Sequence, residues 1–142
     1  MKIYLASSWK NEKRVCGVCD ILRTRGFEVY NFIENGFRWH LIPNVDFLTT
    51  IQKIKHSISQ EKYKNDLKAL ETCDICILIL PSGNDSHLEM GYAKGLGKIC
   101  IIYGELDLGL MNNLADYIIS TPDIIQLLIL LDALDKYRGF KK

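Results

Sequence analysis

Residues 80–98, which read LPSGNDSHLEMGYAKGLGK, decide the fold together with the apolar run of residues 75–80 that leads into them. The run is short, rich in isoleucine and ended by Pro81, as is typical of a strand buried on both faces of a parallel sheet. After the loop, apolar residues recur at helical spacing. The pattern therefore predicts a strand, a polar loop and a helix, with Glu89 in the first turn of that helix.

The same alternation of strand and helix runs through the rest of the chain. We expect further strands at 3–6, 27–32, 99–103 and 117–119, and helices at 11–25, 49–72, around 110–115 and from 121 or 122 to about 137. The segment 49–72 is expected to form one long helix or two shorter ones. Because parallel strands need crossover connections, this order predicts an α/β fold of one domain, 1–142, with a doubly wound parallel sheet of about five strands and helices on both faces.

The composition is that of an average soluble globular protein. The chain has 142 residues, a formal net charge of +1, 48% hydrophobic and 25% charged residues. This balance gives no electrostatic reason to expect nucleic acid or an anionic membrane as a partner. No apolar run approaches the roughly 18 to 20 residues that span a bilayer. Five cysteines, an odd number, and no secretory signal favour reduced thiols and a cytoplasmic location.

Two cysteine pairs, Cys16 with Cys19 and Cys73 with Cys76, look like two halves of a zinc site. The first pair lies in a predicted helix, whereas the second runs into a predicted strand. Residues three apart on a strand point to opposite faces and cannot bind one ion together. We therefore expect no metal site, and we expect no cofactor.

Glu89 has two interpretations that the spacing leaves open. Ser86 and Glu89 fit a capping box, in which both side chains satisfy free amides at a helix start. Alternatively, Glu89 is a reactive carboxylate, because ligands of open α/β sheets bind at the carboxyl ends of the strands. His87 is either a hydrogen-bonded structural residue or an acid, and residues 83–85 taken alone are a turn signal.

Other segments also point to function. Ser7 and Ser8 follow the first strand, where hydroxyls and amides at a helix start can bind an anion. Residues 33–48 lose all periodicity and gather aromatic side chains, and a loop this long is usually functional. The final helix has few polar positions, so we expect its outer face to meet another subunit in a homo-oligomer.

Several fragments in order resemble the nucleoside 2-deoxyribosyltransferase family, whose relatives include the deoxynucleoside 5′-monophosphate N-hydrolases. They are Ile3-Tyr-Leu-Ala-Ser-Ser, Asp74 at the start of the third strand, Ser86 to Lys98, and Leu110 to Asp116. Together they cover about residues 1 to 120, and Glu-x-Gly-Tyr-Ala is the most specific piece. The resemblance implies a flavodoxin-like, Rossmann-like fold, an oligomer, and cleavage of the bond between a sugar C1′ and a nucleobase of a small nucleoside or nucleotide.

The resemblance also implies roles for individual residues. Glu89 matches the family nucleophile, because a carboxylate beneath the sugar can stabilise charge at C1′ or form a covalent intermediate. Transferases of the family usually place an aspartate just after the third strand as the acid, whereas this chain has Pro81-Ser82, which leaves Asp85 or His87 as substitutes. The expected substrate-binding residues are Ser7, Ser8, Trp9, Trp39, Ser82, Gly83, Ser86 and Asn112.

Among these residues, the serines would contact sugar hydroxyls or a 5′-phosphate. Trp9 or Trp39 could stack on a base or could belong to the core. Asn112 is the nearest match to a residue that the family donates across a subunit interface, with Asn113 as a substitute.

Two further functions remain open from the sequence. Ser82, Ser86 and Glu89 also resemble the glutamate helix of Toll/interleukin-receptor-type NAD glycohydrolases, which need no strong acid because nicotinamide leaves as a neutral molecule. Alternatively, the pocket holds a nucleotide as a signal, in a non-catalytic binding module where Glu89 only caps its helix. Within the first interpretation, transfer to a second base and hydrolysis are both possible.

Overall fold

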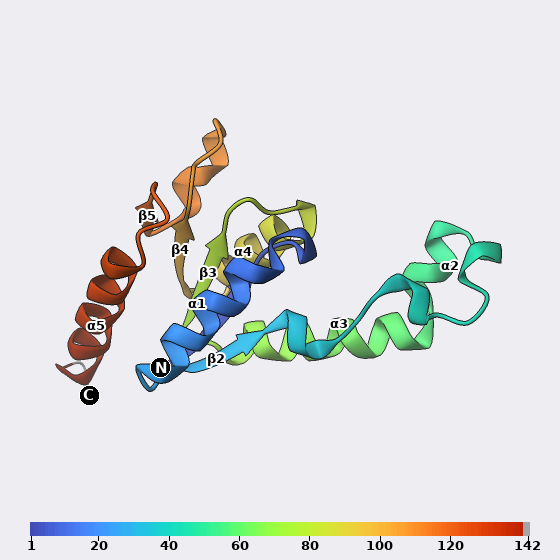
Figure 1. Ribbon diagram of the computed structural model, residues 1–142, viewed down its shortest axis with the longest axis horizontal. Helices are drawn as coiled ribbons and strands as arrows, with labels where there is room; N and C mark the ends of the chain where they lie inside the picture. Colours follow the sequence, from blue (N-terminus) through green and yellow to red (C-terminus); the bar gives the residue numbers. More distant parts are fainter. Residues whose placement is uncertain (141–142) are drawn as a thin grey trace.

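A five-stranded parallel sheet forms the centre of the computed structural model, which describes residues 1–140 (Figure 1). The strand order is β2-β1-β3-β4-β5, with every neighbouring pair parallel. The strands are β1 (Lys2–Ala6), β2 (Glu28–Asn31), β3 (Ile75–Ile79), β4 (Ile99–Tyr103) and β5 (Tyr117–Ile119). The predicted parallel α/β sheet is confirmed, and its order is the one found in flavodoxin-like folds.

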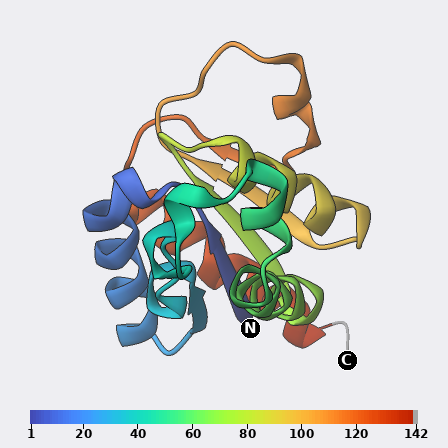
Figure 2. The same ribbon diagram turned by 90° about the vertical axis from the view of Figure 1, so that its right-hand side faces the viewer.

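Helices cover both faces of this sheet. α1 (Glu12–Thr24) and α5 (Ile124–Phe140) pack against one face, where Leu22 and Leu127 meet side chains such as Ile77. α3 (Ser57–Thr72) and α4 (Asn84–Gly95) pack against the other face, where Leu70 and Met90 meet Tyr4 and Leu78. In the view of Figure 2, α3 is seen almost end-on beneath α4. The sheet therefore separates two apolar cores, which explains why β3 is buried along its whole length.

The two cysteine pairs lie on different sides of this sheet. Cys16 and Cys19 belong to α1, whereas Cys73 and Cys76 belong to the core beneath α3 and α4. All five cysteines are free thiols. The two pairs cannot act as ligands of one metal ion, because the central sheet stands between them.

The predicted helical segment 49–72 is two helices. α2 (Thr50–Lys55) begins with a capping box between Thr49 and Gln52, and the chain turns at His56 before α3. The Nδ1 atom of His56 accepts a hydrogen bond from the Ile58 amide at 3.2 Å and so caps the second helix. Among residues 1–140, no helix combines the length and the apolar character needed to cross a membrane.

The aperiodic segment after β2 forms three short 3-10 helices, η2 (Phe32–Asn35), η3 (Trp39–Leu41) and η4 (Val45–Phe47). With α2 they build an arm that projects from the sheet on the side away from α5 (Figure 1). Two further 3-10 helices are η1 (Trp9–Asn11), which precedes α1, and η5 (Leu110–Leu114), in the segment between β4 and β5.

Side chains at and just before the start of α1 donate hydrogen bonds to the end of β3 and to the loop that joins β3 to α4. Ser7 Oγ donates to the Ile79 carbonyl at 2.7 Å, and Arg14 donates to the Leu80 carbonyl at 2.6 Å. Asn11 donates to the carbonyl of Pro81, whose peptide bond with Leu80 is cis. These bonds fix where α4 begins, and α4 carries Glu89.

Replacing Ile77 by alanine tests the buried centre of the sheet. Ile77 lies on β3 and is fully buried, so Ile77→Ala should lower the free energy of unfolding by about 2 to 5 kcal/mol. Urea denaturation followed by circular dichroism measures this loss. Ile51→Ala is the matched control, because Ile51 is 73% exposed on α2 and should cost less than about 0.5 kcal/mol. Equal losses in the two variants would contradict this account of the core.

Candidate active site

A cavity of about 500 Å³ lies at the carboxyl end of the sheet, between α3, α4 and the arm. Aromatic side chains of the arm, Phe37 and Trp39, form part of its wall, and their rings meet edge to face at 4.9 Å. Three carboxyl side chains also line it: Asp66 from α3, and Asp85 and Glu89 from α4. The cavity therefore combines flat apolar surfaces with groups that can exchange protons or attack an electrophile.

Glu89 is the carboxyl group that burial affects most strongly. Its removal from water, helped by the nearby charges of Asp66 and Asp85, raises the pKa of Glu89 from 4.5 to about 8. Tyr4 opposes this rise, because its phenol favours the ionised carboxylate. A carboxyl with such a pKa holds its proton at neutral pH until a ligand or a change of charge alters its surroundings.

The phenol of Tyr4 lies close to this carboxyl. Tyr4 is fully buried on β1, and its hydroxyl makes no hydrogen bond of ordinary geometry among the described residues. It is nevertheless close enough to Glu89 for each group to change the pKa of the other, and the pKa of Tyr4 is raised chiefly by burial. A buried hydroxyl without a partner is rare in native proteins, and the charge that acts on this one most strongly is that of Glu89.

Asp66 is the second carboxyl of the cavity and is partly buried. Its Oδ1 atom accepts hydrogen bonds from the Tyr30 hydroxyl at 2.7 Å and from the Asn35 amide at 3.1 Å. Burial raises the pKa of Asp66, while these two donors act in the opposite direction. The charge of Asp66 makes ionisation of Glu89 less favourable, and the charge of Asp85 does the same to Asp66.

The structure corrects the sequence-based placement of Glu89. α4 begins at Asn84, so Glu89 lies in the second turn of the helix and not in the first. The helix start is satisfied by Ser86, whose Oγ accepts from the Gly83 amide at 3.1 Å and donates to the Gly83 carbonyl at 2.7 Å. The capping interpretation of Glu89 is therefore wrong, because Ser86 closes the helix start without it.

Of the residues expected to act in the site, Glu89, Asp85 and Trp39 line the cavity. His87 does not, because it is exposed and its Nδ1 lies 2.8 Å from the Gly83 carbonyl and 3.4 Å from Ser82 Oγ. Ser86 and Gly83 are occupied with each other at the helix start. These four residues surround the first turn of α4, outside the cavity wall.

The remaining expected binding residues also lie outside the cavity wall. Ser7 bonds the end of β3, and Ser8 Oγ accepts from the Lys10 amide to cap η1. The Trp9 ring is covered by the Arg38 guanidinium, 4.5 Å from its centre. Asn112 lies in η5 and donates to the Asp107 carbonyl at 2.8 Å. Figure 2 shows this segment, in orange, projecting away from α3.

Sequence reasoning missed Asp66, Tyr4 and Tyr30. Asp66 lies one helical turn before Leu70 on the inward side of α3. The sequence feature that could have identified it is a carboxylate within an otherwise apolar helix face. Tyr4 stands in the middle of an otherwise aliphatic buried strand, and a buried phenol needs a partner. Both sequence features are weak evidence when the fold is unknown, because neither identifies the residues that Asp66 or Tyr4 contacts.

The raised pKa of Glu89 predicts a pH-dependent stability. An acid whose pKa is higher in the folded than in the unfolded protein costs stability as the pH rises from about 4.5 to about 8. Glu89→Gln cannot ionise, so its thermal unfolding temperature should exceed that of the wild type by a margin that grows between about pH 4.5 and about pH 8 and then stays constant. Glu61→Gln, at an exposed position of α3, is the control and should show no such trend. A margin for Glu89→Gln that does not change with pH would contradict the burial of this carboxyl.

Comparison with known proteins identifies the fold. No family model and no curated protein matches the sequence. Among solved structures, a 2-deoxyribosyltransferase from Bacillus psychrosaccharolyticus matches with a TM-score of 0.68 and 24% identity, over 89% of this chain and 90% of that one. The CMP N-glycosidase of Clostridium botulinum matches with a TM-score of 0.60 and 20% identity, over 93% and 99%. The chain therefore has the fold of these two proteins, and at the level of the fold its resemblance to the nucleoside 2-deoxyribosyltransferase family is confirmed.

Proposed function

We propose that the protein cleaves the N-glycosidic bond of a nucleoside or nucleotide, with Glu89 as the nucleophile. The observation that carries this proposal is the partly buried carboxyl of Glu89, which faces a cavity and takes no part in capping its helix. The two solved structures that share the fold support it, because one is a 2-deoxyribosyltransferase and the other a CMP N-glycosidase. The aromatic wall at Phe37 and Trp39 offers flat surfaces of the kind on which a nucleobase stacks.

The reaction begins once Glu89 has given up its proton to water, after which the carboxylate attacks C1′ of the sugar. A bond forms between the carboxylate oxygen and C1′, while the electron pair of the bond between C1′ and the base moves to the base nitrogen. Water or a second base then attacks C1′ and releases the Glu89 carboxylate. Attack by water gives hydrolysis, and attack by a second base gives 2-deoxyribosyl transfer.

The departing base needs a proton, which we assign to Asp66. Asp66 lines the same cavity as Glu89, and burial raises its pKa, so it retains a proton more readily than an ordinary aspartic acid. In the second step the Asp66 carboxylate takes a proton from the attacking water or base. Asp85 also lines the cavity but is exposed, and His87 lies outside it, so both are weaker candidates for this acid.

A base-release assay tests the proposed reaction. The purified protein is incubated with nucleosides, deoxynucleosides, their 5′-monophosphates and NAD, with and without a free acceptor base, and the released base is separated by chromatography. We expect free base from at least one nucleoside or nucleotide, and a loss of about 10³-fold or more in kcat for Glu89→Gln. Glu61→Gln should keep the wild-type rate.

Each outcome of this assay discriminates between functions. Base release without an acceptor indicates hydrolysis, and release only with an acceptor indicates transfer. Release of nicotinamide alone would instead indicate an NAD glycohydrolase. Thermal stabilisation by a nucleotide without any base release would contradict the proposal and indicate a binding module.

We also propose that the protein is a homo-oligomer, with a second copy packed against the outer face of α5. Ile125 and Ile129 lie one turn apart on this helix, and each is 64% exposed. Two exposed isoleucines one turn apart on a helix form an apolar patch of the kind that marks protein interfaces.

Light scattering after size-exclusion chromatography tests this interface. The wild type should elute as an oligomer, and the double variant Ile125→Lys, Ile129→Lys should elute as a monomer because lysine cannot be buried there without a partner. Ile51→Lys, at a comparably exposed isoleucine of α2, should leave the mass unchanged. A monomeric wild type at a concentration of about 100 μM would contradict the proposed interface.

A further inference from the structure

The two oxygen atoms of the Asp66 carboxyl have different surroundings. Oδ1 accepts both of the hydrogen bonds described above, from Tyr30 and from Asn35. Oδ2 has no hydrogen-bond partner among residues 1–140, and it is not one of the buried unpaired atoms of this part of the chain. One oxygen is therefore held by the protein, and the other remains open to the cavity that Asp66 lines.

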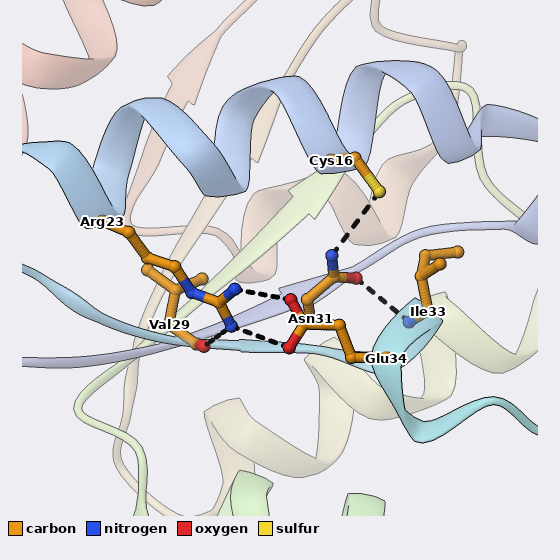
Figure 3. A network of polar contacts seen from close by, with 6 residues as sticks. All are labelled: Cys16, Arg23, Val29, Asn31, Ile33 and Glu34. Carbon is orange, nitrogen blue, oxygen red and sulfur yellow. Dashed lines mark hydrogen bonds and ion pairs between the residues drawn. The ribbon is translucent and has the colours of Figure 1, made fainter.

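The two donors come from a rigid part of the fold. Asn35 ends η2, the 3-10 helix that follows β2, and Tyr30 lies on β2 itself. Figure 3 shows the contacts that fix this junction: Arg23 of α1 binds the Val29 carbonyl at 2.8 Å and forms an ion pair with Glu34. In the same figure, Asn31 bonds the Ile33 amide and reaches the Cys16 sulfur. Both chain neighbours of Tyr30, Val29 and Asn31, and one neighbour of Asn35, Glu34, are thus held by side-chain contacts.

We propose that Tyr30 and Asn35 are positioning residues, which hold Oδ1 of Asp66 so that Oδ2 faces the leaving base of the substrate. This inference rests on the proposed function, in which Asp66 supplies the proton to the base. Asn35 contributes twice, because its amide also reaches the carbonyl of Lys62, one turn before Asp66 on α3. Two donors from one junction fix the rotation and the position of the Asp66 carboxyl group. Proton transfer requires such a fixed alignment of the acid with the substrate.

A tyrosine stack connects this assembly to Glu89. The rings of Tyr4 and Tyr30 are nearly parallel, 13° apart, with their centres 5.2 Å from each other. The hydroxyl of Tyr30 binds Asp66, and that of Tyr4 lies near Glu89. The two stacked rings therefore help to set the distance between Asp66, the proposed acid, and Glu89, the proposed nucleophile.

Several titratable groups lie near Asp66 besides its two donors. Glu89 and Asp85 approach it from α4, Tyr4 lies on β1, and Lys62 lies on its own helix. Burial and the charge of Asp85 raise the pKa of Asp66, whereas Lys62 and the two donors lower it. Removal of one donor therefore has a defined direction: the pKa of Asp66 rises.

Tyr30→Phe tests the proposal, because it removes the donor hydroxyl and keeps the ring in its stack. We expect the carbon-13 resonance of the Asp66 carboxyl to titrate about one pH unit higher than in the wild type, and kcat for base release to fall about tenfold. Asn35→Ala should act in the same direction. Tyr92→Phe is the matched control, since the exposed Tyr92 also donates to a carboxylate, that of Glu71 at 3.1 Å, outside the cavity.

The two measurements separate this inference from the proposed function. An unchanged Asp66 titration in Tyr30→Phe, or a shifted titration with an unchanged kcat, would overturn the positioning role. A wild type that releases no base from any substrate would reject the proposed function and with it the catalytic part of this inference, whereas the titration still reports whether Tyr30 holds Asp66. A shifted titration and a lower kcat in Tyr30→Phe and Asn35→Ala, both absent from Tyr92→Phe, support the proposal.

Discussion

The crowding of acidic groups around Glu89 is the constraint on which the site depends. A carboxyl group removed from water loses the solvation that stabilises its charge, and a second carboxyl beside it makes ionisation harder still. In this chain Glu89 bears both penalties, since burial and Asp66 act on its pKa in the same direction. A helix cap could be satisfied at far lower cost, as Ser86 shows at the start of the same helix. The arrangement is costly for folding and useful for chemistry, which is typical of an active site.

The parallel sheet places this carboxyl where a ligand can reach it. β1 and β3 are neighbours at the centre of the order β2-β1-β3-β4-β5, and their following helices leave on opposite faces. Such a switch point opens a crevice at the carboxyl edge of the sheet. The bonds from Ser7, Asn11 and Arg14 then fix the loop from which α4 starts. The helix that carries Glu89 therefore starts from a loop held by side chains 66 to 72 positions earlier in the sequence.

The sequence predicts the layers of the fold because strands and helices differ in period and because buried strands are continuous apolar runs. β3 and β4 follow from their isoleucines alone. The first residue of α4 could not be predicted, because Ser86 fits either the N-cap position of a helix or the N3 position, three residues later. Its actual place at the third position moves Glu89 into the second turn.

The partners of Glu89 were less accessible to sequence reasoning than the residue itself. Asp66 meets Tyr30 across 36 positions and Asn35 across 31, and no local spacing encodes such contacts. The serines of the first loop were identified as polar residues at the right edge of the sheet, yet Ser7 bonds a strand end and Ser8 caps a short helix. Loop position thus predicts where polar groups gather, and only the packed structure shows which of them face the cavity.

The most direct test of the central claim is a crystal structure of Glu89→Gln with a bound nucleoside or nucleoside 5′-monophosphate. The account predicts the base against Phe37 and Trp39, and the side-chain oxygen or nitrogen of residue 89 within about 3 to 3.5 Å of C1′. A ligand bound elsewhere, or bound in the cavity with C1′ out of reach of residue 89, would contradict the account.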